Sequence, residues 1–320
     1  MHGHDPSYDD FYAFSYPHEP FDVPPQSWGE NTPWGFAEPF DGAPFVARNF
    51  GVFTTSDLQA IGINPRTFLP KAVAKGRLRR LERGIYARPG ANSQVVRAIL
   101  LGGRISCLSA CKLYGLWVPH SPRLHVLTLR NVMTAKNSDV IMHSQHRRPP
   151  LLVPSPLETV EQVLHFHDAE TGLMVLDSAL NKGLLRLEEV PELIRNLSKR
   201  KQRVLIRATG LAQSGLETRV RNFLISERVP VRPQVEIPTV GRVDMVAGES
   251  LILECNGDAF HSTKEQRNRD YLRIQNAKLL GYETVSLSYE QIFYRWEETK
   301  AYLRRLIRQR RHLRKPTPLR

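Results

Sequence analysis

The sequence has few cysteines, no long apolar run and no basic leader. Its three cysteines, Cys107, Cys111 and Cys255, form no C-x-x-C pair, and none sits in a Cys/His ligand motif. No run of about eighteen apolar residues occurs, and the N-terminus is acidic where a secretory signal is basic. These absences predict a cytoplasmic protein with buried thiols, neither secreted nor spanning a membrane.

Basic residues are absent from the start of the chain and abundant afterwards. The first 47 residues hold eight of the 32 acidic residues and no Lys or Arg, so the remainder carries 45 basic against 24 acidic residues, a net charge of +21. Solubility does not need such an excess of one sign, and a region this basic usually binds the phosphates of a partner. We therefore expect nucleic acid as the partner and no membrane.

Residues 1–44 are rich in Pro, Gly, Asp and aromatic residues and show neither helical nor strand periodicity. This composition predicts a disordered acidic arm. The arm either folds back on the basic body as a nucleic-acid mimic, docks a protein partner through its aromatics, or is an untethered leader.

Residues 45–150 begin with the pattern of a winged helix-turn-helix. Thr54 or Thr55 can cap a helix that Gly62 ends, and Asn64-Pro65 opens a second helix that Gly76 closes. Residues 78–88 then alternate as a two-stranded ribbon that turns near Arg83-Gly84. A second helix of this kind fits a major groove, and a ribbon reaches adjacent phosphate or minor groove. The basic residues expected to contact DNA here are Arg66, Lys71, Lys75, Arg79, Arg80 and Arg83.

The middle of the chain predicts helices and one clear strand. Helices are expected near residues 94–101 and 109–116, a strand at residues 124–129, and a short strand or helix entry at 104–107. Residues 151–208 predict a helical linker of three helices trailed by a basic run at 199–203. The histidines of this part are scattered rather than spaced as ligands, so no metal is expected at His120, His125, His143 or His146.

Two carboxylates ten positions apart mark the C-terminal region. Asp244 and Glu254 each follow an apolar run, and neighbouring strands bring such side chains to one point. A helix from Ser214 places Glu217 in its first turn, and three strands, a helix, a fourth strand and a closing helix over residues 289–306 are expected to follow it. Carboxylate oxygens suit Mg²⁺, with Mn²⁺ as a substitute, and such an ion activates water for attack on phosphate. Solvated acidic residues on a hairpin are the alternative interpretation.

These patterns resemble two known families. Residues 46–150, especially Gly51-Val-Phe-Thr-Thr55, Gly76-Arg-Leu-Arg-Arg80 and Arg83-Gly-Ile-Tyr86, resemble the winged-helix region of AbiEi-type antitoxins. Residues 214–295 resemble the Vsr-like endonucleases, the very-short-patch-repair relatives in the PD-(D/E)XK superfamily. The resemblance implies a restriction-endonuclease-like α/β domain with a small mixed sheet. It implies candidate catalytic residues Asp244, Glu254 and Glu217, with Asp244 and Glu254 on the metal.

The second acidic strand departs from the family pattern. Glu254-Cys255-Asn256 carries an amide where an E-x-D-G or E-x-K ending has a charged group, and an amide is not a general base. Asn256 is still a candidate catalytic residue, because its amide can ligate the ion or position water. His261, at a spacing similar to that of very-short-patch-repair enzymes, is expected to supply the base that Asn256 is not. On the helix that follows, Arg267 and Arg273 are expected to face phosphate, and Asp270 to hold His261 or Arg273.

The sequence thus predicts an α+β protein. It is divided into the arm (1–44), the winged-helix region (45–150), the helical region (151–208), the endonuclease-like domain (209–303) and a basic tail (304–320). The leading hypothesis is a Mg²⁺-dependent DNA endonuclease targeted by its winged helix. The alternatives are an AbiEi-like DNA-binding transcriptional regulator whose nuclease domain has degenerated, and an RNA-directed nuclease. Target sequence, nicking against double-strand cutting, and oligomeric state do not follow from the sequence.

Overall fold

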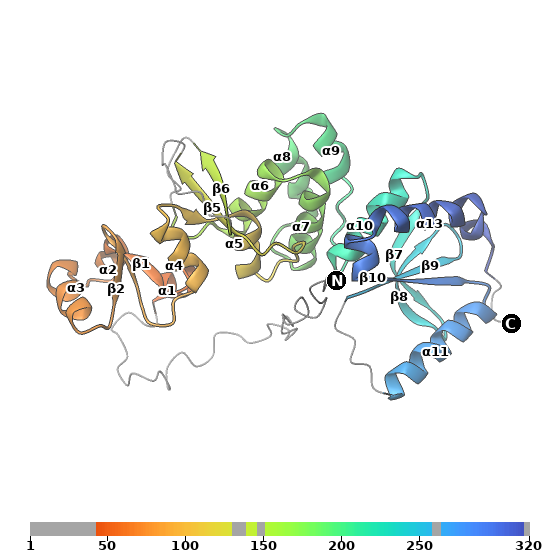
Figure 1. The fold of residues 1–320 in the computed structure, drawn as a ribbon, viewed down its shortest axis with the longest axis horizontal. Helices are drawn as coiled ribbons and strands as arrows, with labels where there is room; N and C mark the ends of the chain where they lie inside the picture. Colours follow the sequence, from red (N-terminus) through yellow and green to blue (C-terminus); the bar gives the residue numbers. More distant parts are fainter. Residues whose placement is uncertain (1–42, 130–138, 146–150, 258–263, 317–320) are drawn as a thin grey trace, which may run out of the picture.

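A computed structural model describes residues 43–129, 139–145, 151–257 and 264–316, with the side chains of 264–267 excepted. Figure 1 shows three regions in a row, which are the N-terminal helices and ribbon, a middle region, and the C-terminal sheet with its helices. The mixture of helices with three small sheets confirms the expected α+β class. Nearly all of the predicted acidic arm lies outside the described residues.

The N-terminal region has the elements of a winged helix. Helix α1 (Pro44–Arg48), strand β1 (Val52–Thr54), α2 (Thr55–Ala60), α3 (Pro65–Ala74), β2 (Arg79–Glu82) and β3 (Ile85–Ala87) follow in order. The capping predictions hold, because Thr54 forms a capping box with Asp57 and Asn64 caps α3. Strand β1 adds a third strand to the predicted ribbon, in the antiparallel order β1-β3-β2.

The middle region begins with a second small sheet. It comprises α4 (Ser93–Leu100), β4 (Arg104–Ile105), α5 (Cys107–Leu113), β5 (Leu124–Leu129) and β6 (Val140–Gln145). Strand β6, which the sequence did not indicate, pairs in parallel with β5, while β4 pairs antiparallel on its other edge. Gly103 permits this packing, since a Cβ there would lie 2.4 Å from a Val126 methyl carbon.

The helices that follow complete the middle region. They are α6 (Pro156–Phe166), α7 (Ala169–Asn181), the 3₁₀ helix η2 (Leu187–Glu189), α8 (Val190–Ile194) and α9 (Lys199–Leu205). The three predicted helices correspond to α6, α7 and the pair of η2 and α8. The basic run expected to trail them is instead helical, because Ser198 caps it as α9. Leu205 of the same helix is buried in a core that also includes Leu108 and Leu116, so one hydrophobic core spans both sides of residue 150.

The C-terminal region follows the predicted order of helix, three strands, helix and strand. It comprises α10 (Gly215–Ser226), β7 (Val231–Ile237), β8 (Gly241–Ala247), β9 (Leu251–Asn256), α11 (Lys264–Leu279) and β10 (Glu283–Ser288). The sheet order is β10-β9-β8-β7, with only β10 and β9 parallel. Helix α10 shares one apolar cluster with the sheet, and α11 shares a cluster that includes Ile252 and Ala277. Figure 1 shows these helices on opposite sides of the sheet.

The closing helix differs from the prediction of one helix over residues 289–306. It is divided into α12 (Tyr289–Phe293) and α13 (Trp296–Arg308), with the 3₁₀ helix η3 (Arg311–Leu313) behind. The break places Trp296 with its ring edge against Phe223 of α10, so aromatic packing on the sheet's helix layer outweighs continuation of one helix.

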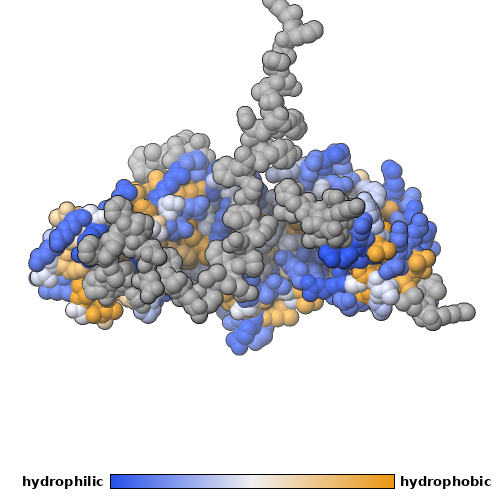
Figure 2. Space-filling model, turned by 90° about the horizontal axis from the view of Figure 1, so that it is seen from below, coloured by the Kyte–Doolittle hydropathy of each residue, from blue (hydrophilic) through white to orange (hydrophobic). Residues whose placement is uncertain are grey.

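The surface of the described residues is mostly polar. Figure 2 shows, on the face it presents, hydrophilic residues interrupted by small separate apolar patches. Within the described residues no helix combines the length and the apolar character that crossing a membrane requires.

Candidate functional site

The carboxylate pair on β8 and β9 is brought together by strand register. Met245 pairs with Leu253 and Val246 with Ile252, so continuation of this antiparallel register sets Asp244 opposite Glu254. The Asp244 N–H donates to Glu254 Oε2 at 3.2 Å, and the Cys255 N–H donates to Asp244 Oδ2 at 2.7 Å. Each carboxylate therefore reaches across to the backbone of the opposite strand.

Electrostatics in this pair favour a bound proton or cation. Burial, together with the charges of Asp244 and Glu217, raises the pKa of Glu254 to about 7. Burial also raises the pKa of Asp244. The hydrogen bond from the Cys255 N–H and the charge of Arg273 lower this pKa, but burial has the larger effect. Two carboxylates that repel each other in a half-buried place are stabilised by any positive charge between them.

Glu217 joins the pair from the first turn of α10. Its carboxylate accepts hydrogen bonds from Gln213 N at 3.0 Å, Ser214 Oγ at 2.9 Å and Gln234 Nε2 at 2.8 Å. Burial and the charge of Asp244 raise its pKa. The side chain is thus fixed, and its charge lies beside the pair.

Gln234 is a site residue that the sequence analysis missed. It has a left-handed backbone with φ of 51°, and it lies on β7 between Pro233 and Val235, which pair with Met245 and Val243 of β8. A non-glycine residue in this conformation is uncommon and strained. Pro233 inside the strand was the one available signal, because proline in a strand marks an irregular position.

Arg273 of α11 points into the carboxylate pair. Its Nη2 lies 3.2 Å from Glu254 Oε1 and donates to Arg242 O, while its Nε donates to Val240 O at 2.8 Å. These partners hold the guanidinium against the sheet, and the expected contact of Arg273 with phosphate stays a prediction. Asp270 lies 3.9 Å from the same guanidinium, as expected for one of its two predicted partners.

Of the remaining residues predicted for this site, the structure describes Asn256 fully and Arg267 only in its backbone. Asn256 ends β9 with an exposed side chain and pairs with Ser288 of β10. His261 lies outside the described residues, and so does the side chain of Arg267, whose backbone belongs to α11. Their predicted roles stay predictions.

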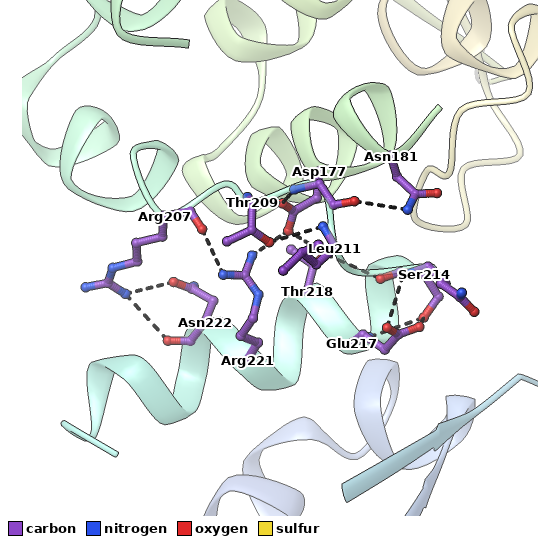
Figure 3. Close-up of polar contacts among 12 residues, drawn as sticks. Asp177, Asn181, Arg207, Thr209, Leu211, Ser214, Glu217, Thr218, Arg221 and Asn222 are labelled. Carbon is purple, nitrogen blue, oxygen red and sulfur yellow. Dashed lines mark hydrogen bonds and ion pairs between the residues drawn. The ribbon is translucent and has the colours of Figure 1, made fainter. Parts of the chain in front are cut away.

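Helix α10, which carries Glu217, is anchored to the middle region by a buried ion pair (Figure 3). Asp177 of α7 and Arg221 of α10 have side chains only 1% and 2% exposed. The Asp177 carboxylate also accepts from Thr218 Oγ1 and from two backbone N–H groups, those of Thr209 and Gly210. Because a buried charge must be paired, this network fixes the helix that presents Glu217.

The winged helix presents the predicted basic surface. All six of its predicted DNA-contacting residues are exposed, and none forms an ion pair with another described residue: Arg66, Lys71, Lys75, Arg79, Arg80 and Arg83. A groove of about 490 Å³ beside the ribbon is lined by Arg79, by the half-buried Arg77 and Arg88, and by Arg97, which pairs with Asp139. Exposed cations around a concave surface attract phosphate.

The prediction that the middle-region histidines are scattered was wrong for two of the four. His120 is exposed and His146 lies outside the described residues, but His125 Nδ1 and His143 Nε2 are 3.0 Å apart. Cys107 and His167 join them, so that one ligand atom from each of the four residues lies within 4.8 Å of the others. Cys107, which belongs to no Cys/His ligand motif in the sequence, therefore lies among histidine ligand atoms in the fold.

Comparison with known proteins supports one region of the chain. The family described as transcriptional regulator, AbiEi antitoxin, matches residues 43–89, which span α1 to β3. The N-terminal region is therefore similar to that family, as its motifs predicted, while the Vsr-like resemblance of the C-terminal region stays a prediction. No curated protein matches the chain.

One solved structure, the RV2827C protein from Mycobacterium tuberculosis, matches 54% of this chain and 72% of its own at 15% identity. Its TM-score is 0.19, so the likeness carries no argument about fold or function.

Proposed function

We propose that the protein binds duplex DNA through its winged helix and hydrolyses the DNA backbone at the carboxylate pair of its C-terminal sheet. Binding is supported by the match to a transcriptional-regulator family at residues 43–89 and by the exposed cations on α3 and the ribbon. Together with the net charge of the chain beyond its acidic start, these cations fit a polyanion.

The observation that carries the cleavage proposal is the pairing of Asp244 and Glu254 across β8 and β9. Their oxygens are a donor set that fits Mg²⁺ or Mn²⁺. Such an ion, held by Asp244 and Glu254, would polarise the phosphate and lower the pKa of the attacking water. Glu217 adds negative charge, and Gln234 keeps the Glu217 carboxylate in place. The roles of Asn256, His261 and Arg267 remain as the sequence predicted them, Asn256 to position water and His261 to act as base.

The test is cleavage of a supercoiled plasmid in the presence of Mg²⁺. We expect nicked or linear product from the unmodified protein and none from Asp244→Ala. Glu236→Ala is the matched control, since Glu236 is an exposed acidic residue on the adjacent β7. Equal cutting by the unmodified protein and Asp244→Ala would reject the assignment of the site. RNA as the cut substrate, with DNA left intact, would reject the choice of nucleic acid.

A second function, that of a DNA-binding regulator without cleavage, is favoured by Arg273. Its guanidinium pairs with Glu254 and so supplies the positive charge that an ion would otherwise supply. Asn256 in place of a charged residue favours the same outcome. Sequence-selective DNA binding with no product under Mg²⁺ or Mn²⁺, from the unmodified protein and from Arg273→Gln alike, would establish the regulator and reject the nuclease.

A further inference from the structure

Four side chains with metal-binding atoms meet in the middle region, far from the carboxylate pair. They are Cys107 at the start of α5, His125 on β5, His143 on β6 and His167 directly after α6. One ligand atom of each lies within 4.8 Å of the corresponding atoms of the other three. Cys107 and His125 are buried, and the other two are half-buried.

The parallel register of β5 and β6 explains how the two strand histidines meet. His125 pairs with Ile141, and side chains two apart share a face, so His143 lies on the face of the sheet that His125 occupies. Their rings stack with centroids 5.3 Å apart. His167 approaches from the end of α6, with its ring 5.1 Å from that of His125 and 5.7 Å from that of His143.

Cys107 is held in an unusual backbone conformation beside these rings. Its φ is 47°, in the left-handed region that a cysteine rarely adopts. Its N–H donates to the side chain of Gln162 at 3.1 Å. This hydrogen bond connects Cys107 to α6, the helix that directly precedes His167. Strain of this kind persists only where surrounding structure maintains it, and it gathers at functional sites.

Hydrogen bonding within the protein leaves the cluster incompletely satisfied. His125 has partners at both ring nitrogens, Ser121 Oγ at 3.2 Å and His143 Nε2 at 3.0 Å. The Nε2 atom of His167 is buried and has no hydrogen-bond partner among the described residues. A buried polar atom without a partner costs free energy, and His167 also contributes one ligand atom to the cluster.

The dimensions fit a small tetrahedral ion. Zinc bonds of about 2.0–2.1 Å to nitrogen and about 2.3 Å to sulfur place the four ligand atoms roughly 3.3–3.8 Å from one another. From the observed upper limit of 4.8 Å, a bound ion would draw the ligand atoms together by about 1 to 1.5 Å. One sulfur and three imidazole nitrogens suit a borderline ion such as Zn²⁺ and do not suit Mg²⁺.

We propose that Cys107, His125, His143 and His167 form a tetrahedral Zn²⁺ site. On binding, the Cys107 thiol loses its proton to solvent as the zinc–sulfur bond forms, and each neutral imidazole gives one lone pair. Four protein ligands leave no position for water or substrate, which makes the site structural. The ion ties α5, β5, β6 and the end of α6 together, and so joins the sheet of the middle region to its helices.

The first experiment uses the full chain and Co²⁺ as a spectroscopic probe. After removal of metal with a chelator and of the chelator by gel filtration, one equivalent of Co²⁺ should produce visible d–d bands of a tetrahedral ion and a thiolate-to-cobalt charge-transfer band in the near ultraviolet. The carboxylate pair cannot produce the second band, so Asp244→Ala should keep it. Protein purified without chelator should contain one zinc per chain by elemental analysis.

Variants assign the ligands. Cys107→Ser should abolish the charge-transfer band, and His143→Ala should lower zinc affinity by more than about 100-fold, beyond the effect typical of residues that only support a ligand. The matched controls are Cys111→Ser, a buried cysteine of the same helix, and His165→Ala, an exposed histidine two residues before His167. Both should bind zinc as the unmodified protein does.

Two results would overturn the proposal. One is the absence of the charge-transfer band when Co²⁺ is added to the unmodified protein, which does not depend on any variant folding correctly. The other is full zinc content in Cys107→Ser, which would place the metal elsewhere and leave the four residues as a buried hydrogen-bonded cluster.

Discussion

The carboxylate pair and the cysteine–histidine cluster are built by opposite routes. Asp244 and Glu254 stand on consecutive strands joined by a short turn, so pairing of neighbouring strands suffices to bring them together. The cluster takes one residue from each of four segments, and only the packing of a sheet against two helices assembles it. Spacing along the chain therefore reveals the first kind of site and conceals the second.

Burial also acts on the two groups with opposite consequences. It disfavours the charged form of every ionisable group. In the carboxylate pair this raises the pKa of Glu254 to about 7, so the favoured neutral form carries a proton and is a poor metal ligand. In the cluster burial lowers the pKa of His125 to about 3, with further lowering by neighbouring cations and histidines, so the favoured neutral form has a free lone pair.

The largest expected effect tests whether the two groups are independent. Asp244→Asn should reduce Mg²⁺-dependent cleavage by about 10⁴-fold, roughly 5.5 kcal/mol of barrier, because an amide holds the ion poorly. The same variant should leave the cobalt–thiolate band unchanged. Plasmid cleavage rates and absorption spectra of one preparation measure both, and a band that disappears with Asp244 would mean that the groups are coupled.

The next largest effect concerns the ion pair of Asp177 and Arg221, which joins the middle region to the C-terminal region. Asp177→Ala should destabilise the protein by about 3 to 5 kcal/mol, because the Arg221 guanidinium stays buried without its partner. Thr209→Ala is the control, since the Thr209 backbone N–H, which donates to Asp177, is retained. Hydrogen exchange in α7 and α10 reports the loss, and unchanged protection would show that the network is not needed.

A smaller effect sharpens the electrostatic contrast. In the metal-free protein burial raises the pKa of Glu254 from its usual 4.5 to about 7. Its favourable contribution is therefore complete below about pH 4.5 and lost as the pH rises through about 7. Glu254→Gln, which is always neutral, should match the unmodified protein at pH 4 and exceed its stability at pH 8 by roughly 1 to 3 kcal/mol. Thermal unfolding at both pH values checks this, and an equal difference at both would contradict it.

The smallest expected effect concerns the contribution of the N-terminal region to DNA binding, apart from both groups. Lys71→Ala should weaken duplex binding by less than about 10-fold and reduce the slope of log affinity against log salt by about 0.9, the value for one phosphate contact. Arg195→Ala, an exposed arginine on the helical part, should change neither. Fluorescence anisotropy across a salt series measures both, and a slope equal to that of the unmodified protein would remove Lys71 from the interface.

How far the sequence predicted the fold depends on whether local or distant contacts decide each element. The winged helix follows from caps and turns at Thr54, Asn64 and Gly84, all local signals, and its order was predicted. The division of the last helix depends on Trp296 meeting Phe223, some seventy positions earlier, and β6 depends on pairing across residues 130–138. Such contacts leave little trace in periodicity.

The same distinction holds for the candidate site. Asp244 and Glu254 were predicted because each ends an apolar run on neighbouring strands, and Asp270 because it lies one turn before Arg273. The inward direction of Arg273 and the left-handed Gln234 were not predictable, since both depend on backbone carbonyls and side chains that only the folded sheet presents.

The buried ion pair of Asp177 and Arg221 has a consequence for how this protein can be divided. A fragment that begins at residue 209 would keep α10 and the whole C-terminal sheet but would carry a guanidinium with nothing to neutralise it, on the helix that presents Glu217. A fragment that ends there would keep the complementary carboxylate. A fragment designed to contain the C-terminal sheet should therefore include α7, so that Arg221 keeps the carboxylate that neutralises it.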